Sequence, residues 1–448
     1  PAASRASQRR FRRSVPKDDG GAAAATMTGP EKVVLVGVGI KGRLWEMDSS
    51  LAELRRLAET AGAQIVAEHS QAVDRFNPAT LLGSGKIEQI ALSASAHKAK
   101  SVIFDMELSP SQQKNLEGVI KAKVLDRTRL ILDIFAQRAR TNEGRLQVEL
   151  AQLSYMLPRL TGSWRSYSQQ VGGIGTRGPG ERKLEYERRH IQNRILRLQK
   201  ELRKVKSGRD LRRQGRLAVP VPQIALIGYT NVGKSTLLNR LTAQSVRGHK
   251  TEAVYADDKL FATLDATARR VRLPEGTWAV ATDTVGFIQR LPTTLVAAFR
   301  STLEEARLAD CLLLVADANA PSRESQDQAV DRIVAELGAK DLPQERIYNK
   351  ADLLDAAARR DLQALHPGAL LVSATTGEGL DAALTRVQEL ISTRWLLREL
   401  DLPSHDRRRV ASVYRCAQVL SERHVGTKTR LRLRVTRENL ERLRVLSA

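Results

Sequence analysis

The fold is decided by the sequence of residues 223–241, QIALIGYTNVGKSTLLNRL. Residues 223–227 have the apolar character of a buried strand, and residues 236–241 have the apolar spacing of a helix. Between them stands Gly228-Tyr-Thr-Asn-Val-Gly-Lys-Ser235, a P-loop in the strand–loop–helix context that this motif requires. Its glycines let the backbone wrap around a phosphate, and the amides at the helix N-terminus attract negative charge. The stretch therefore predicts a nucleotide-binding α/β domain.

The P-loop also suggests individual contacts with the phosphates. Lys234 is expected to neutralise the β- and γ-phosphates, and Ser235 to place its hydroxyl on Mg²⁺. The residues expected to contact the nucleotide here are Gly228, Tyr229, Thr230, Asn231, Val232, Gly233, Lys234, Ser235 and Thr236.

Three further segments follow in the order that a GTP-binding domain requires. Asp283-Thr-Val-Gly286 offers a carboxylate for Mg²⁺ and, at Gly286, an amide that can sense the γ-phosphate. Another of these segments ends at Asp352. The Asp352 carboxylate can accept hydrogen bonds from guanine N1 and the exocyclic amine, a donor pair that adenine lacks. These features predict GTP rather than ATP. The base-binding residues are expected to be Asn349, Lys350, Asp352, Ser373 and Ala374.

The residue after Gly286 bears on the rate of hydrolysis. Ras-type proteins place a water-orienting glutamine there, whereas this chain has Phe287. Because a phenyl ring cannot orient or polarise water, we expect slow intrinsic turnover that a partner accelerates, with Gln289 near enough in sequence to be recruited. Some GTPases with an apolar residue after this glycine use an asparagine at the position of Asn231 to hold K⁺. Stimulation of hydrolysis by K⁺ is therefore an open alternative for this protein.

Charge is distributed unevenly along the chain. Of the 448 residues, 73 are Lys or Arg and 50 are Asp or Glu, which gives a formal net charge of +23. Residues 217–400 carry −2, whereas residues 181–216 carry +9 and residues 401–448 carry +7. A near-neutral nucleotide domain between basic flanks predicts a polyanionic partner such as RNA.

Bulk composition excludes several classes of protein. No run of 18 apolar residues is present, so a membrane-spanning helix is not expected. Two cysteines, Cys311 and Cys416, exclude a disulfide framework and a Cys-rich zinc site, and they fit a reduced intracellular setting. The Arg-rich segment 5–13 has two interpretations, a disordered basic tail or an organellar transit peptide. We expect a bacterial-type cytoplasm, with an organelle matrix as the alternative.

Periodicity divides the rest of the chain. A disordered tail is expected over residues 1–30, and strands alternating with helices predict an N-terminal α/β domain over 31–136. Within it, Asp48 is expected to cap a helix that ends near Thr60. Apolar residues three and four apart over 137–216 predict a long antiparallel helical hairpin with a glycine-rich tip and a basic second helix.

The remaining residues predict the nucleotide domain and a small final domain. We expect a Ras-like P-loop GTPase domain over 217–397 and a small basic C-terminal α/β domain over 398–448. In the latter, Arg430, Arg432 and Arg434 alternate with apolar residues, which predicts a strand with one basic face. The fold class expected for the whole chain is α/β.

Several segments resemble those of the HflX-type translational GTPases, nearly throughout the chain from Val33. The most specific is the glycine-rich signature Gly172-Gly-Ile-Gly-Thr-Arg-Gly-Pro-Gly-Glu181. Arg182-Lys183 departs from it, because the family usually has Thr-Gln there. Other segments also carry the resemblance: Phe261-Ala-Thr-Leu-Asp265, Asp283-Thr-Val-Gly-Phe-Ile288 with Leu291-Pro292, and, in the first domain, Leu108-Ser-Pro110 with Asn115-Leu116.

The resemblance implies site residues and a cellular role. It favours Thr263 as the switch I threonine, with Thr267 and Thr251 as alternatives. Lys234, Thr263 and Gly286 would then act in catalysis, and Ser235, Thr263 and Asp283 would hold Mg²⁺. The implied role is a GTPase that binds the large ribosomal subunit and its rRNA and splits stalled ribosomes under stress.

Two other functions remain open at this point. One is a GTPase of ribosome assembly or RNA modification, and the other is a GTP-gated RNA-binding switch whose hydrolysis is incidental. A monomer is expected, because the apolar seams of the two hairpin helices can cover each other within one chain.

Overall fold

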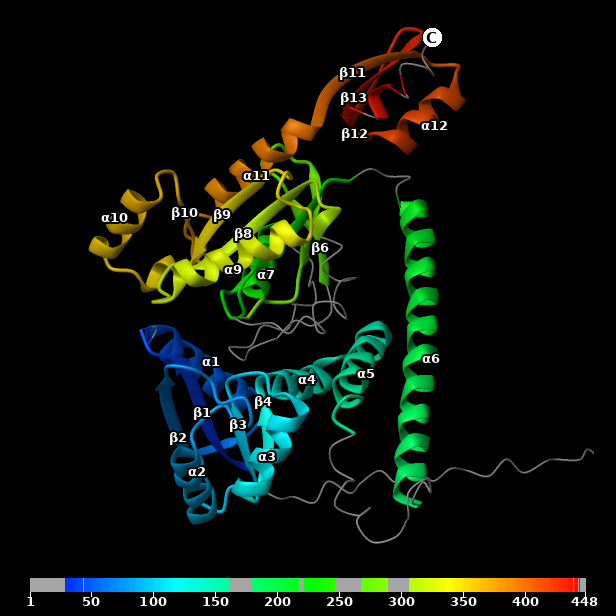
Figure 1. Ribbon diagram of the computed structural model, residues 1–448. Helices are drawn as coiled ribbons and strands as arrows, with labels where there is room; N and C mark the ends of the chain where they lie inside the picture. Colours follow the sequence, from blue (N-terminus) through cyan, green and yellow to red (C-terminus); the bar gives the residue numbers. More distant parts are fainter. Residues whose placement is uncertain are drawn as a thin grey trace, which may run out of the picture.

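A computed structural model describes residues 29–42, 44–160, 179–216, 221–245, 267–288, 306–437, 439–441 and 443. Three sheets lie in an N-terminal unit (residues 29–138), a central unit (221–394) and a C-terminal unit (395–443), and two helices connect the first to the second (Figure 1). Four sequence predictions lie outside the described residues: the basic tail, the tip loop, Thr263 with its alternative Thr251, and the segment with Gln289, Leu291 and Pro292.

The N-terminal unit is a four-stranded parallel sheet in the order β2-β1-β3-β4, with two helices on each face (Figure 1). Alternate side chains of β1 serve the two faces, because Val33 and Leu35 pack with α1 and α4 whereas Val34 and Val36 pack with α2 and α3. The elements are β1 (Lys32–Ile40), α1 (Leu44–Thr60), β2 (Gln64–Val73), α2 (Ser84–Ala96), β3 (Ser101–Phe104), α3 (Pro110–Ile120), β4 (Lys123–Asp126) and α4 (Arg127–Arg138).

Helix α1 begins earlier than the sequence suggests. Gly42 has a φ of +89°, which allows a sharp turn directly after β1, and the helix starts at Leu44. Asp48 therefore lies inside the helix, and the prediction that it caps the helix is wrong.

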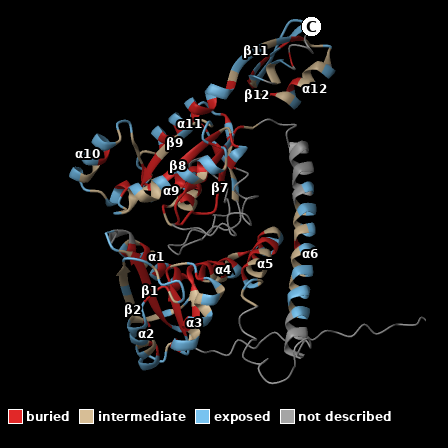
Figure 2. Cartoon of the chain, viewed as in Figure 1, coloured by how far each residue is buried: buried red, intermediate tan, exposed pale blue. Residues whose placement is uncertain are grey.

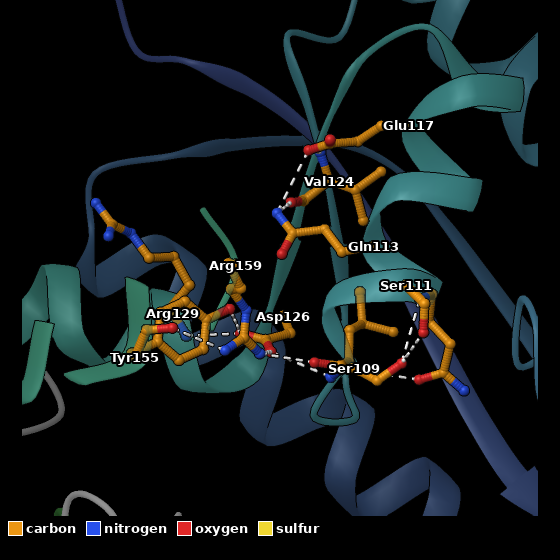
Figure 3. A network of polar contacts seen from close by, with 11 residues as sticks. Ser109, Ser111, Gln113, Glu117, Val124, Asp126, Arg129, Tyr155 and Arg159 are labelled. Atoms are coloured by element: carbon orange, nitrogen blue, oxygen red, sulfur yellow. Dashed lines mark hydrogen bonds and ion pairs between the residues drawn. The ribbon is translucent and has the colours of Figure 1, made fainter. Parts of the chain in front are cut away.

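Helix α5 (Asn142–Met156) is held to the N-terminal unit by the buried carboxylate of Asp126 at the end of β4 (Figure 3). This carboxylate is 2.8 Å from the Tyr155 hydroxyl and 3.3 Å from Arg159 Nη2. It also accepts from the backbone amides of Leu108 and Arg129. Burial and the neighbouring Asp126 raise the pKa of Tyr155, so the hydroxyl stays a donor. The direction in which α5 leaves the sheet is thereby fixed.

Helix α6 (Pro179–Arg216) packs against α5 along the predicted apolar seam. Leu198 of this seam is fully buried, and Arg194 Nε lies 2.7 Å from Glu149 Oε1 of α5. At 38 residues, α6 spans about 57 Å, whereas the 15 residues of α5 span about 22 Å. Much of α6 therefore has no counterpart on α5, and most of its described side chains are exposed (Figure 2).

The central unit is a six-stranded sheet in the order β10-β9-β8-β5-β7-β6, parallel except for β6. Strand β5 lies between β8 and β7, so its carboxyl end is a point where the strand order reverses and where ligands bind in such sheets. The elements are β5 (Gln223–Gly228), α7 (Lys234–Ser245), β6 (Thr267–Arg272), β7 (Trp278–Asp283), β8 (Cys311–Asp317), α9 (Arg323–Glu336), β9 (Gln344–Asn349), η1 (Ala351–Leu353), α10 (Ala356–Leu365), β10 (Leu370–Leu371) and α11 (Leu380–Arg394).

The C-terminal unit is a three-stranded antiparallel sheet, β11-β13-β12, with helix α12 beside it and helical residues after β13. Leu431, Leu433 and Val435 are buried in its apolar core, and the arginines between them point to the other face. The predicted alternation is confirmed, but Arg434 is only 2% exposed, so the basic face is partly covered. The elements are β11 (Trp395–Pro403), α12 (Arg407–Cys416), β12 (Gln418–Val425) and β13 (Lys428–Thr436).

Two expectations about the whole chain concern membranes and cysteines. None of the helices in the described part of the chain has the length and apolar character needed to cross a membrane. Cys311 is buried and Cys416 is half-buried, and both are free thiols.

Candidate nucleotide site

The P-loop runs from the end of β5 to the start of α7 in a conformation that requires its two glycines. A Cβ at Gly228 would lie 2.2 Å from the Val315 carbonyl oxygen, too close for any side chain. Gly233 has a φ of +87°, and a Cβ there would lie 2.3 Å from Asn349 Nδ2. The sequence spacing of this motif therefore has a direct structural cause.

Lys234 is the buried cation of this loop. Its side chain turns back, and Nζ donates to the Tyr229 carbonyl at 2.7 Å and to the Gly228 carbonyl at 3.2 Å. Burial lowers the pKa of Lys234 to about 8, although the Asp283 carboxylate opposes this effect. The ammonium group is thus held where the strand meets the loop, in reach of phosphates bound by the loop.

Ser235 and Asp283, the two residues in the described part of the chain that were predicted to hold Mg²⁺, are brought together. The Ser235 hydroxyl donates to Asp283 Oδ2 at 2.6 Å, and Asp283 is fully buried at the end of β7. These are hard oxygen ligands that suit Mg²⁺. Among the described residues, no group of three or more His, Cys, Asp or Glu could hold a metal.

Thr267, the alternative switch I residue that the structure describes, lies at the start of β6. It pairs in register with Asp283 on β7. Its backbone therefore belongs to the sheet.

Asn349 ties the base-binding loop to the P-loop. It is only 2% exposed, its Nδ2 donates to the Val232 carbonyl at 2.8 Å, and its Oδ1 accepts from the Ala374 amide at 3.0 Å. Ser373 Oγ in turn accepts from the Thr376 amide and closes the following turn. Asn349 therefore positions two loops at once, a role that the motif alone does not reveal.

The two other residues of this motif point elsewhere. Lys350 has a φ of 65°, and its Nζ lies 2.7 Å from Asp317 Oδ2 at the end of β8. Asp352 lies exposed in the short helix η1 after β9. An exposed carboxylate at the carboxyl end of the sheet is available to a guanine base.

Phe287 does not face the nucleotide position. Its side chain is 1% exposed and belongs to the apolar core, while its backbone oxygen accepts from the Thr230 amide at 2.7 Å. The Thr230 amide is thus occupied by this bond and does not point at a phosphate. A Cβ at the preceding Gly286 would lie 3.0 Å from Lys234 Nζ. A glutamine at position 287 would bury an amide in the core, so this substitution is not a clean test of water orientation.

A hydrogen-bonded chain links the P-loop to the N-terminal unit. The Tyr229 hydroxyl donates to Glu53 Oε1 on α1 at 2.6 Å, and Glu53 Oε2 lies 2.5 Å from Arg127 Nη2. Arg127 Nη1 in turn donates to Asp105 Oδ1 at 2.8 Å. Burial alone would lower the pKa of Arg127, but the two carboxylates outweigh it and raise that pKa.

The sequence did not predict this series of hydrogen bonds between the P-loop and the N-terminal unit. Tyr229 was expected to contact the nucleotide, whereas its side chain is buried and directed to Glu53. The partners are 176 positions apart, and no local pattern reports such a contact.

Known proteins match the chain in both sequence and order of segments. Residues 48–136 match the family model described as GTP-binding GTPase N-terminal, residues 138–216 match GTP-binding GTPase Middle Region, and residues 223–350 match 50S ribosome-binding GTPase. The GTPase HflX of Caldanaerobacter subterraneus is 46% identical over 343 residues, which cover 77% of each chain. The chain belongs to the HflX family of GTPases. It is accordingly a GTP-hydrolysing enzyme.

Two more comparisons describe this HflX-family chain. The GTPase HflX of Escherichia coli is 41% identical over 374 residues, which cover 83% of this chain and 86% of that one. The crystal structure of a GTP-binding protein from Sulfolobus solfataricus in complex with GDP is 24% identical and covers 81% of this chain and 99% of its own, with a TM-score of 0.41.

We expect nucleotide binding to this HflX-family protein to take up protons at mildly alkaline pH. Burial holds the pKa of Lys234 at about 8, whereas bound phosphates would favour its charged form and raise that pKa. At about pH 8.5 much of Lys234 is then neutral before binding, and part of a proton is taken up with each GDP. Calorimetric titration with GDP in two buffers of different ionisation enthalpy measures this uptake.

The Lys234→Arg variant is the internal control, because an arginine stays charged and should remove the uptake. Lys41→Met, at an exposed lysine paired with Asp74, should leave the uptake unchanged. The same lowered pKa predicts that unfolding of the nucleotide-free protein becomes costlier as pH rises from about 8 to 10.5, because only the unfolded lysine keeps its proton there. Buffer-independent heats at pH 8.5 would contradict the assignment.

Proposed function

We propose that this HflX-family GTPase binds the large ribosomal subunit in its GTP form and dissociates stalled or idle ribosomes, with hydrolysis stimulated by the ribosome. The observation that carries the proposal is family membership, since residues 223–350 match a model described as 50S ribosome-binding GTPase. The role under stress belongs to the same proposal. We place the protein in a bacterial-type cytoplasm, in line with the bacterial relatives.

Nucleotide binding would use the loops at the carboxyl end of the central sheet. The amides of residues 231–236 and the Lys234 ammonium would hold the phosphates, and Asp352 would accept from guanine N1 and its amine. Ser373 and Ala374 would read guanine O6 through a backbone amide. Asn349 holds these loops together through its contacts with Val232 and Ala374.

Hydrolysis would be an in-line attack of water on the γ-phosphate. Lys234 and the loop amides would stabilise the charge that develops on the phosphate oxygens, and the Gly286 amide, close to Lys234, would sense the γ-phosphate. Mg²⁺ held by Ser235 and Asp283, with Thr263 as a further ligand, would neutralise the β- and γ-phosphate oxygens. Because the Phe287 side chain lies in the core, we propose slow turnover until a partner supplies or orders the missing group.

The proposed rRNA contact is the helical pair. On α6, Arg188, Arg197 and Lys200 are exposed, and residues 181–216 carry a net charge of +9. Few acidic residues are available to pair with these cations, which favours contact with phosphate groups. We propose that the predicted domains, 31–136, 137–216, 217–397 and 398–448, act as one monomer in which the hairpin reaches into the subunit.

The decisive measurement is the GTP turnover rate of the full chain, alone and with saturating purified large subunits. We expect a rise of at least about tenfold, equivalent to about 1.4 kcal/mol off the barrier, and no comparable rise with small subunits. Light scattering of intact ribosomes should then fall when the protein and GTP are added. Unchanged turnover in spite of binding would contradict stimulation by the ribosome.

The same assays separate the two rival functions. A factor for ribosome assembly or RNA modification would prefer precursor particles, and a GTP-gated switch would bind RNA without faster hydrolysis. Repeating the turnover assay in K⁺ and in Na⁺ tests the proposal that Asn231, which has a φ of 60°, helps to hold a stimulating K⁺. Equal rates in the two salts would remove K⁺ from the mechanism.

A further inference from the structure

Arg434 is a buried cation at the contact between the C-terminal and central units. It lies on β13 in the row that also contains Arg430 and Arg432, but its side chain is only 2% exposed. A guanidinium so placed needs acceptors, because an unpaired buried charge is strongly unfavourable. All of the acceptors that the structure describes for it belong to the central unit.

Those acceptors come from two elements of the central unit. Glu275, in the turn between β6 and β7, forms an ion pair with Arg434, and Thr277 Oγ1 lies 3.4 Å from Nη1. The amide of Gln388 on α11 faces the guanidinium, which presents only donors, so its oxygen is assigned to this side, where it accepts from Nη1 at 2.6 Å. Thr277 and Gln388 are themselves buried, at 2% and 5% exposure.

The turn that Arg434 contacts belongs to the β6–β7 hairpin, residues 267–283. The C-terminal unit makes a second contact with this hairpin, since Gln418 Nε2 on β12 donates to the Trp278 carbonyl at 3.3 Å. The far end of β7 is Asp283, which accepts from Ser235 in the candidate Mg²⁺ site. The six residues of β7 span about 20 Å, so a single paired strand joins Arg434's partners to that site.

We propose that Arg434 is a positioning residue that couples the C-terminal unit to the nucleotide state through the β6–β7 hairpin. Separating the hairpin turn from β13 would break the ion pair with Glu275 and the hydrogen bonds to Thr277 and Gln388, which favours movement of the hairpin turn and β13 as one piece. A shift of Asp283 between nucleotide states is then passed to the C-terminal unit. By linkage, a ligand that holds the C-terminal unit changes the relative affinities for GTP and GDP to the same extent.

The test is hydrogen–deuterium exchange of the full chain bound to GDP or to a non-hydrolysable GTP analogue. In the wild type, the amides of β11 and β13 should exchange at rates that differ between the two states by about fivefold or more. In Arg434→Met, which keeps the volume and removes the charge, this difference should disappear while GDP still binds. A purely structural role would raise exchange in both states and leave their ratio unchanged.

Two further variants keep the test decisive. Glu275→Gln removes the ion pair from the central side, where the side chain is 57% exposed, and should also abolish the difference without endangering the fold. Arg430 lies on the same strand as Arg434 and pairs with Asp401 of β11 at 2.8 Å. Arg430→Met removes this pair and should leave the difference in exchange between the two nucleotide states intact. The proposal is overturned if the wild type shows no difference, or if Arg434→Met and Glu275→Gln both retain it.

Discussion

Replacing Asp352 by asparagine is expected to weaken GTP binding by about 10²- to 10⁴-fold and to create binding of XTP. The variant would lose the two charge-assisted hydrogen bonds that the carboxylate accepts from guanine, each worth about 1.5–3 kcal/mol. An asparagine amide can instead donate to the 2-oxo group that xanthine has in place of the guanine amine. Affinities of the wild type and of Asp352→Asn for GDP and XDP, measured by competition with a fluorescent nucleotide, would show the exchange of preference.

Asp355→Asn is the matched control for this prediction. Asp355 lies three residues further along and caps α10 through the Ala358 amide at 2.7 Å. An asparagine keeps a cap oxygen, so this variant should retain the helix and leave base preference unchanged. Because Asp352 is exposed, its substitution should not disturb the core. Unaltered preference for GDP in Asp352→Asn would show that another group reads the base.

Arg127→Met is expected to destabilise the N-terminal unit by about 3–5 kcal/mol, because removing one member of a buried ion pair leaves its partners uncompensated. Here the partners are the fully buried Asp105 and Glu53, which also accepts from Tyr229 of the central unit. The slowest-exchanging amides of β1 and β3 report opening of this unit, and their exchange should accelerate by about 10²- to 10⁴-fold.

Arg129→Met provides the comparison on the same helix. Arg129 pairs with Asp133 at 3.1 Å across a partly exposed surface, so its loss should cost about 1 kcal/mol or less. Adding Asp105→Asn and Glu53→Gln to Arg127→Met should recover part of the loss, since the stranded charges are removed. If the amides of β1 and β3 exchange at the same rates in Arg127→Met and Arg129→Met, the buried triad does not stabilise the unit.

The sequence predicted those parts of the fold whose causes are local. The strand over Ser101–Phe104 and the helix over Pro110–Ile120 have such causes, because Ser109 and Pro110 mark the helix start and three of the four strand residues are apolar. The start of α1 was missed, since Asp48 has the side chain of a cap but the turn at Gly42 already allows a helix. Residue preferences at helix ends compete with backbone geometry, which the sequence shows only indirectly.

In the candidate site, too, the features with local causes were predicted and those that depend on contacts between units were not. Ser235 and Asp283 meet as their motifs imply, because parallel strands bring their carboxyl ends to one edge of the sheet. Arg434 was expected on a basic face, but the central unit covers it, and a strand pattern cannot show what another unit places on its surface. The Glu53 contact is similar, since it depends on how two separately formed units meet.

Glu53 has a consequence for exchanging parts between relatives. Its two carboxylate oxygens serve different units, one accepting from Tyr229 in the P-loop and the other pairing with Arg127. A chimera that takes its first 138 residues from one protein and the remainder from another would keep this contact only if both parents supply the matching partner. The acid, the tyrosine and the arginine must therefore be inherited as a set, and a crossover between them is safe only where that set is shared.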